Sequence, residues 1–195
     1  MKDEPVFEYH PEEALISINH PDGNKREINI KSGWSFGTGG HETTRLCIKA
    51  IEELFNNNKI ESVLDIGCGS GVLSITSSAL GADDVLGIDI DSSIVDEARG
   101  NASNNALTLP VKFSTEPLSE INQQYKLVTA NILLKTIISL IDDISKSVSD
   151  SGFLITSGIK KKDKDEAVNI IENSGFNLLK IYSENDWVAV LFKKS

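Results

Sequence analysis

A glycine-rich stretch, "LDIGCGSG" at residues 64–71, is the part of the sequence whose spacing most clearly predicts a binding site. It follows a run typical of a buried strand and opens one typical of a helix. Gly67, Gly69 and Gly71 would let a ligand approach the backbone, near the partly positive N–H groups of the helix start. Asp89, in "GIDID", follows about twenty residues later, where an acid accepts hydrogen bonds from ribose hydroxyls. We therefore predict a ligand that contains a ribose.

The residues around the glycines distinguish between two kinds of ribose ligand. A dinucleotide fingerprint reads G-x-G-x-x-G, but Val72 occupies the position of its third glycine here. Asp65, just before the loop, would repel a pyrophosphate and attract an ammonium group. The pattern therefore favours S-adenosylmethionine, which carries a ribose, an adenine and an amino-acid ammonium group. A dinucleotide-dependent oxidoreductase is the alternative that Asp65 and Val72 argue against.

A second stretch, "GWSFGTGGHETT" at residues 33–44, holds glycines, a histidine, a carboxylate and two threonines. Ordering so many glycines is costly in chain entropy, which favours a role in ligand binding over packing alone. Ligands of parallel sheets bind at the carboxyl ends of the strands, so both glycine clusters are expected to face one crevice.

Three further motifs narrow the family. "LDIGCGSGVLSI" followed by "GIDID" resembles the first two motifs of the Rossmann-like, class I methyltransferases. With "FGTGGHETTRLCIKAI", "TANILL" and "SGI" at 157–159, the chain resembles the methyltransferases that modify large-subunit ribosomal protein eleven, which are protein lysine methyltransferases. The resemblance extends from about Gly33 to "DWVAVLFKK", and it implies S-adenosylmethionine as cofactor and a lysine amine as acceptor.

The resemblance also implies roles for single residues. Thr44 would contact the cofactor, Gly67 would lie under its methionine part, and Asn131 would border the transferring methyl group. Phe36 and Thr38 would belong to a lid over the cofactor. With the residues argued from charge and spacing, the predicted cofactor-binding set is Phe36, Thr38, Thr44, Asp65, Gly67, Gly69, Asp89, Ile90 and Asn131.

Asn131 is the predicted catalytic residue. A lysine amine has a pKa of about 10.4 in water, so it must lose a proton before it attacks a methyl group. Desolvation in a narrow pocket lowers that pKa. The side-chain carbonyl of Asn131 can accept a hydrogen bond from the amine and leave its lone pair directed at the methyl group. His41, just before a predicted helix, is interpreted as a helix cap rather than as a base.

The elements that would position these residues alternate between strand and helix. Five strands are expected at 62–67, 85–90, 111–115, 126–132 and 152–158, and helices at 43–57, 72–80, 92–105, 134–149 and 162–174. The tail forms two strands around "SEND", and "EALISINHPDGNKREINI" at 13–30 forms a hairpin. The sequence therefore predicts an α/β, Rossmann-like class I methyltransferase fold. Its mostly parallel seven-stranded sheet would have helices on both faces and a C-terminal antiparallel hairpin.

Composition excludes several classes of protein. The 195 residues carry a formal net charge of −10, and Asp163 and Asp165 interrupt the basic run "KKKDK" at 160–164. We therefore expect no direct nucleic-acid binding and favour a basic protein partner. No apolar run approaches the length of a membrane span, and the acidic N-terminus has no signal-peptide pattern, so we expect a cytoplasmic protein with no membrane contact. Cys47 and Cys68 have no metal-site or disulfide pattern, and no metal is predicted.

The predicted domain organisation differs from that of the family. Residues 1–32 would form an N-terminal β-hairpin extension and residues 33–195 the S-adenosylmethionine-dependent methyltransferase domain, without the family's separate recognition domain. This leaves the ribosomal protein as one acceptor among others. The alternatives are a lysine of another protein, such as the electron-transfer flavoprotein, a small molecule, or no acceptor at all in a non-catalytic cofactor-binding module.

Overall fold

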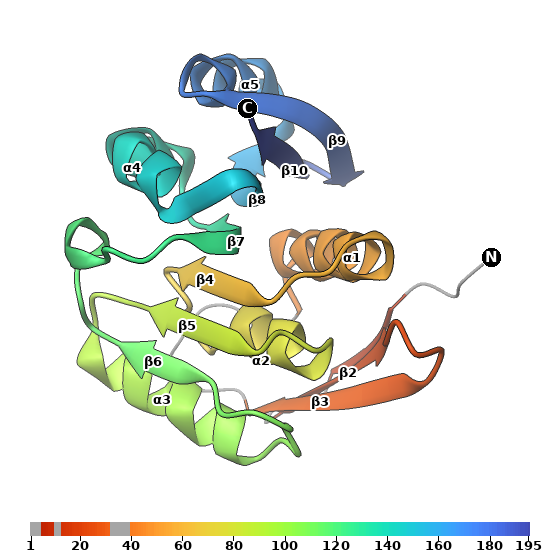
Figure 1. Cartoon of the computed structure of the whole chain (residues 1–195). Helices are drawn as coiled ribbons and strands as arrows, with labels where there is room; N and C mark the ends of the chain where they lie inside the picture. Colours follow the sequence, from red (N-terminus) through yellow and green to blue (C-terminus); the bar gives the residue numbers. More distant parts are fainter. Residues whose placement is uncertain (1–4, 10–12, 32–39) are drawn as a thin grey trace.

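The computed structural model describes residues 5–9, 13–31 and 40–195, so the predicted lid residues Phe36 and Thr38 lie outside the described part (Figure 1). The predicted N-terminal hairpin is confirmed: β2 (Glu13–Asn19) pairs antiparallel with β3 (Lys25–Lys31). A further strand that the sequence did not predict, β1 (Val6–Tyr9), pairs antiparallel with β2. The three strands form a small sheet of their own.

The main sheet has seven strands in the order β6-β5-β4-β7-β8-β10-β9. These are β4 (Ser62–Ile66), β5 (Asp84–Ile88), β6 (Lys112–Ser114), β7 (Tyr125–Asn131), β8 (Val148–Lys160), β9 (Phe176–Glu184) and β10 (Trp187–Lys194). The first five in this order are parallel, and β10 runs antiparallel to both of its neighbours. The strand order reverses between β4 and β7, which is where such sheets bind ligands.

Helices cover both faces of this sheet (Figure 1). On one face, α1 (Glu42–Asn57) and α2 (Val72–Ala79) share a buried apolar cluster with β4, and α3 (Ser92–Ser103) packs beside α2 and β6. On the other, α4 (Leu134–Ser147) and α5 (Lys164–Asn173) bury Ile137 and Ile171 against β7, β8 and β9. β4 is almost wholly buried because both of its faces are covered. The predicted architecture, a mostly parallel seven-stranded sheet with helices on both faces and a C-terminal antiparallel hairpin, is confirmed.

The small sheet packs against the same core as α1 and α2. Four isoleucines of β2 and β3 face this core and are fully buried: Ile16, Ile18, Ile28 and Ile30. Asn105, just after α3, extends the contact because its side-chain amide accepts from the Asn29 N–H and donates to the Asn29 carbonyl, both at 2.8 Å. Within the described residues, the N-terminal strands are therefore joined to the α/β fold by apolar burial and by hydrogen bonds.

The boundary between α4 and β8 differs from the prediction. The helix was expected to reach residue 149 and the strand to begin at 152, but α4 ends at Ser147 and β8 begins at Val148. Lys194, from the end of β10, donates to the carbonyls of Ser145 and Val148 at 2.6 and 2.7 Å. A cation at this helix end is favourable, and it comes from a residue distant in the sequence. Local sequence therefore could not place the boundary.

Candidate active site

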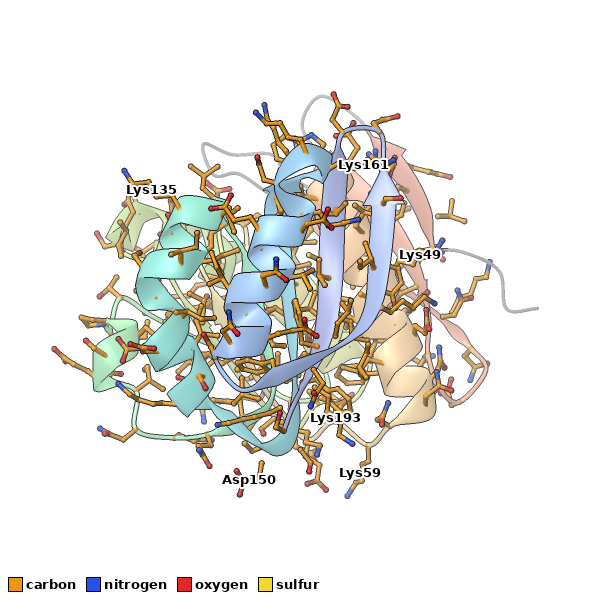
Figure 2. All side chains as sticks on the ribbon, turned by 90° about the horizontal axis from the view of Figure 1, so that it is seen from above. Lys49, Lys59, Lys135, Asp150, Lys161 and Lys193 are labelled. Carbon is orange, nitrogen blue, oxygen red and sulfur yellow. The ribbon has the colours of Figure 1, made fainter. Side chains whose placement is uncertain are left out.

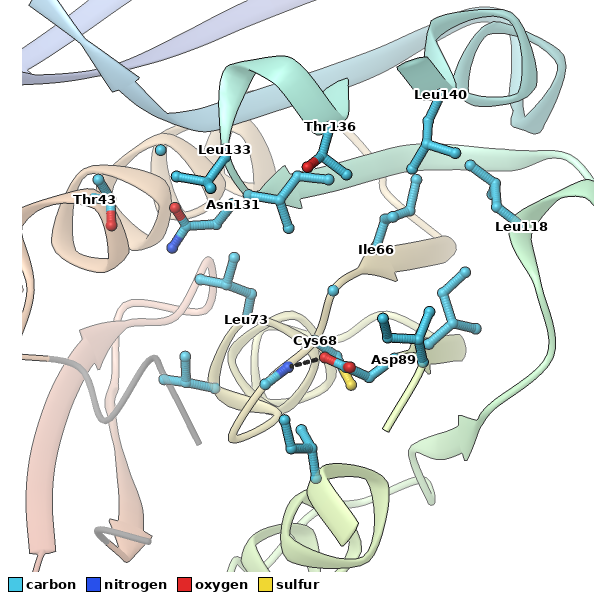
Figure 3. A pocket seen from close by; sticks show the side chains of 18 of the residues that line it. Thr43, Ile66, Cys68, Leu73, Asp89, Leu118, Asn131, Leu133, Thr136 and Leu140 are labelled. Atoms are coloured by element: carbon cyan, nitrogen blue, oxygen red, sulfur yellow. Dashed lines mark hydrogen bonds between the residues drawn. The ribbon is translucent and has the colours of Figure 1, made fainter. Parts of the chain in front are cut away.

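A cavity of about 810 Å³ opens at the carboxyl edge of the parallel strands (Figure 3). Its walls come from the ends of β4, β5 and β7, the first turn of α1, the segment 116–119, one face of α4, and Trp187 at the start of β10. This volume is in the range of small-molecule sites. Its position is the switch point of the sheet, where the sequence placed both glycine clusters. The cluster at residues 33–44 lies mostly outside the described residues.

The glycine loop after β4 forms the floor of the cavity. Gly67, Gly69 and Gly71 have φ angles of 68°, 54° and 81°, in the left-handed region that favours glycine. The N–H groups of Gly67 and Cys68 donate to the Ile88 carbonyl at 2.9 and 3.0 Å, which fixes the loop against the end of β5. Gly67 and Gly69 both line the cavity.

Asp89 and Ile90, directly after β5, also line the cavity. The Asp89 carboxylate accepts a hydrogen bond from the Gly69 N–H at 3.2 Å, the contact marked in Figure 3, and another from the Asp91 N–H at 3.3 Å. Ile90 is 97% exposed, an unusual state for an isoleucine, and it adds an apolar edge to the mouth. The loop and the acid are therefore brought together at one wall.

Asp65 is placed differently from the prediction. Its side chain is 1% exposed, and it is not among the described residues that line the cavity. The carboxylate lies under the loop and accepts from the hydroxyls of Ser74 and Thr129, both at 2.7 Å. Burial raises its pKa, and these two hydrogen bonds oppose the shift. Asp65 therefore links α2 to β7 beneath the loop, and in this position it does not contact a ligand's ammonium group directly.

Asn131, at the end of β7, faces the cavity (Figure 3). Its side-chain Nδ2 donates to the Thr44 hydroxyl at 3.4 Å. Its Oδ1 is buried and has no hydrogen-bond partner among the described residues. A buried carbonyl without a partner costs free energy, so its retention at a cavity wall points to a ligand that donates a hydrogen bond. Thr44 lines the cavity as well, fully buried in the first turn of α1.

His41 is the N-cap of α1, as the sequence predicted. Its Nδ1 accepts from the Thr43 N–H at 3.3 Å and lies 2.8 Å from the Thr43 hydroxyl. The Nδ1 atom is thus engaged in the cap of α1, which agrees with a structural role for this side chain. The ring packs edge-on against Trp187, with centroids 5.1 Å apart.

Several cavity residues were missed by sequence reasoning. Glu116, Pro117, Leu118 and Ser119 follow β6, and Leu118 belongs to a short 3-10 helix. Thr136, Leu140 and Asp143 come from one face of α4. Their position after β6 and β7 was a usable signal, since the carboxyl ends of parallel strands meet at this edge. Trp187 follows from the topology: β10 is antiparallel, so its first residue lies at the same edge.

The charges of the cavity suit a cationic ligand. Of the described residues that line it, Asp89, Glu116 and Asp143 are carboxylates and none is lysine or arginine. Burial raises the pKa of Cys68 on the floor well above its usual range, so this thiol stays neutral and is not a nucleophile. No group of three or more His, Cys, Asp or Glu side chains in the described part of the chain could hold a metal ion.

Comparison with known proteins agrees with the fold. Residues 14–195 match the family model described as ribosomal protein L11 methyltransferase (PrmA). The ribosomal protein L11 methyltransferase of Thermoanaerobacter pseudethanolicus is 39% identical over 172 residues, which cover 88% of this chain and 55% of that protein. That of Clostridium perfringens is 34% identical over 174 residues, 89% of this chain and 55% of that protein. The chain therefore spans about half the length of these curated relatives, 55% of each.

Solved structures of methyltransferases share the fold of this chain. The crystal structure of ribosomal protein L11 methylase from Lactobacillus delbrueckii subsp. bulgaricus matches with a TM-score of 0.74 and 27% identity, over 80% of each chain. Magnesium protoporphyrin IX methyltransferase of Synechocystis, solved with bound SAM, matches with a TM-score of 0.64 and 20% identity over 84% of this chain and 86% of that chain, a likeness of fold alone. No described helix is long and apolar enough to cross a membrane. Because the family model covers nearly the whole chain, the protein belongs to the ribosomal protein L11 methyltransferase family.

Proposed function

We propose that this protein transfers a methyl group from S-adenosylmethionine to a lysine amine of a protein, and that ribosomal protein L11 is the acceptor. The observation that carries the proposal is the unpartnered, buried Oδ1 of Asn131 at the wall of the cavity. An amine nitrogen can donate a hydrogen bond to this oxygen.

The cavity residues fit the cofactor. Asp89 would accept hydrogen bonds from the ribose hydroxyls, and Gly67 and Gly69 would leave room for its methionine part beside the loop. Ile90 and Leu118 offer apolar surface to the adenine. A cavity with three carboxylates and no described lysine or arginine also suits a sulfonium cation better than a pyrophosphate. Bound there, S-adenosylmethionine supplies an activated methyl group, which forms a C–N bond with the amine as its C–S bond breaks.

The chain's own part in the reaction is to bind, orient and desolvate the amine. We assign His41 no role as a base, because its Nδ1 accepts from the Thr43 N–H in the cap of α1. The Asn131 carbonyl then holds one N–H, which directs the nitrogen lone pair away from Asn131 and toward the reacting carbon. The apolar wall residues Leu73, Ile132 and Leu133 exclude water from the amine and lower its pKa.

The names of the relatives support ribosomal protein L11 as acceptor. An acidic chain with a net charge of −10 favours a basic protein partner, in agreement with that choice. An acceptor on the ribosome would place the reaction in the cytoplasm. A lysine of another protein remains the second candidate, and the acceptor assay below separates the two.

Two experiments test the proposal. In titration calorimetry we expect S-adenosylhomocysteine to bind and NADH not to bind, and the reverse would contradict the cofactor assignment. The second experiment combines the protein with S-adenosylmethionine carrying a labelled methyl group and with purified ribosomal protein L11. Mass spectrometry should find the label on lysine nitrogen. If L11 stays unlabelled while a protein of a cell lysate is labelled, the assignment of L11 as acceptor is wrong, whereas the assignment of protein methyl transfer is kept.

A further inference from the structure

The backbone at Asn131 is held on both sides. Asn131 pairs in register with Ser157 of β8. The next residue, Ile132, lies between two cavity glycines with positive φ angles, Gly67 and Gly158. A Cβ added to Gly67 would lie 2.5 Å from Ile132 Cγ2, and one added to Gly158 would lie 2.3 Å from the Ile132 carbonyl oxygen. Such close approach on both sides leaves the peptide after Asn131 little freedom to shift.

The side-chain amide of Asn131 is not fixed by its backbone. The last torsion of asparagine is broad and roughly two-fold, so the carbonyl and the amino group can exchange places at little intrinsic cost. The two orientations differ chemically, because one presents an acceptor to the cavity and the other presents donors. Only the acceptor can bind the N–H of an amine. A contact outside the strand must therefore hold the amide.

That contact is the Thr44 hydroxyl, which accepts from Asn131 Nδ2 at 3.4 Å. Thr44 is itself fixed: it is fully buried, and its N–H donates to the carbonyl of the cap residue His41 at 3.1 Å. With Nδ2 directed to Thr44, the buried Oδ1 is left without a partner among the described residues. The hydroxyl thus joins the first turn of α1 to the end of β7.

We infer that Thr44 is a positioning residue that holds the Asn131 amide with its carbonyl presented to the acceptor amine. This inference rests on the proposed methyl transfer to lysine. It assigns to the Thr44 hydroxyl a role in the rate of transfer, distinct from the cofactor contact that resemblance alone implied.

The test uses Thr44→Val, which removes the hydroxyl and keeps the shape, and Thr44→Ser, which restores the hydroxyl. Thr76→Val is the matched control, because Thr76 is a fully buried helix residue whose hydroxyl has no partner among the described residues and is outside the cavity wall. We expect Thr44→Val to lower the single-turnover methylation rate about tenfold, the loss typical of one hydrogen bond. The Kd for S-adenosylhomocysteine should stay within about twofold, since the amide, not the cofactor, loses its partner. Thr44→Ser and Thr76→Val should keep both values near those of the parent.

A second readout does not depend on activity. The side-chain NH₂ signal of Asn131 in a ¹⁵N-labelled protein is assigned by its absence in Asn131→Asp. It should move in Thr44→Val and Thr44→Ala, and stay in place in Thr44→Ser. An unmoved signal in the Val and Ala variants overturns the inference, and so does a loss of S-adenosylhomocysteine affinity as large as the loss of rate. If the parent methylates no lysine, the proposed function fails, whereas the NMR arm still tests the contact.

Discussion

At the scale of single residues, two acids on neighbouring strands show how position decides role. Asp65 is in β4 and Asp89 just follows β5, and both belong to the motifs that predicted the ligand. Asp89 lines the cavity, whereas Asp65 is buried beneath the loop with two hydroxyl donors. Asp89 is therefore placed to bind a ligand, whereas Asp65 supports the loop. Each assignment gives a separate prediction.

Replacing Asp89 by asparagine should weaken the binding of S-adenosylhomocysteine. The carboxylate would lose charge-assisted hydrogen bonds to the ribose, a cost of about 1.5–3 kcal/mol, or about tenfold to a hundredfold in Kd. Titration calorimetry measures it. The matched control is Asp150→Asn. Asp150 is exposed near the start of β8, and Figure 2 shows it far from Lys161, which directly follows the other end of this strand. Equal affinities in parent and Asp89→Asn would remove Asp89 from the ribose site.

Replacing Asp65 by asparagine should change how stability depends on pH. Burial raises the Asp65 pKa, so its ionised form is disfavoured in the folded state. The parent therefore loses stability as the pH rises from about 4, the ordinary carboxyl pKa, through the raised pKa. Asp65→Asn lacks this loss. The free energy of unfolding of the variant minus that of the parent should increase across this window in urea titrations and then level off. A difference independent of pH would mean that Asp65 does not titrate there.

At the scale of elements, the start of α1 and the end of β7 carry the site. The His41 cap fixes the first turn of α1, which contains Thr44. The glycines that flank Ile132 fix the end of β7, where Asn131 faces the cavity. Both arrangements can be disturbed without touching Asn131, which yields two further predictions.

For the helix start, His41→Ala should lose about 0.5–2 kcal/mol of unfolding free energy because the Thr43 N–H loses its acceptor. His41→Asn should restore most of it, since asparagine is a preferred cap. The methylation rate of His41→Asn should stay within about twofold of the parent. A general base contributes about a hundredfold or more to a rate, so a loss of that size in His41→Asn would show that His41 acts as one.

For the strand end, Gly158→Ala is compared with Gly175→Ala. Both glycines have positive φ angles, 79° and 92°, so alanine is strained at each. A Cβ at Gly175 meets nothing within 4 Å, whereas one at Gly158 would lie 2.3 Å from the Ile132 carbonyl oxygen. Gly175→Ala should therefore cost about 1–2 kcal/mol in urea unfolding, and Gly158→Ala clearly more. Equal losses would show that Ile132 is not held by Gly158.

The elements also show what the sequence could and could not predict. The helices α1 to α5 and the strands β4 to β10 follow from local periodicity, and their ends shift by a few residues. Gly67 and Asp89 were predicted because their spacing within one βαβ unit encodes the loop and its acid. Leu118 and Leu140 follow β6 and β7, so their place at this edge could have been predicted. Trp187 reaches the same cavity only because β10 is antiparallel to β8, which no local pattern contains. The burial of Asp65 likewise depends on Thr129, which lies in another strand.

At the scale of the whole molecule, the net charge and the strand order both favour a site for a cationic ligand at one edge of the sheet. The chain carries a net charge of −10, and its described cavity lining includes carboxylates but no basic side chain. The strand order brings an acid from β5, an amide from β7 and a helix start from α1 to one edge. Such a site favours cations, and both a sulfonium and a lysine side chain are cations in water. Methyl transfer therefore requires that the lysine amine lose its proton before it reacts.

The most direct test is the pH dependence of single-turnover methylation of ribosomal protein L11 by the parent and by Asn131→Asp, at saturating S-adenosylmethionine. The substitution keeps the size of the side chain and puts a negative charge beside the acceptor, which raises the pKa of the amine and favours its unreactive, protonated form. We predict that Asn131→Asp is slower near neutral pH, that its rate rises more steeply with pH, and that it approaches the parent at alkaline pH. Superimposable pH profiles for the two proteins would contradict the claim that Asn131 orients the acceptor amine.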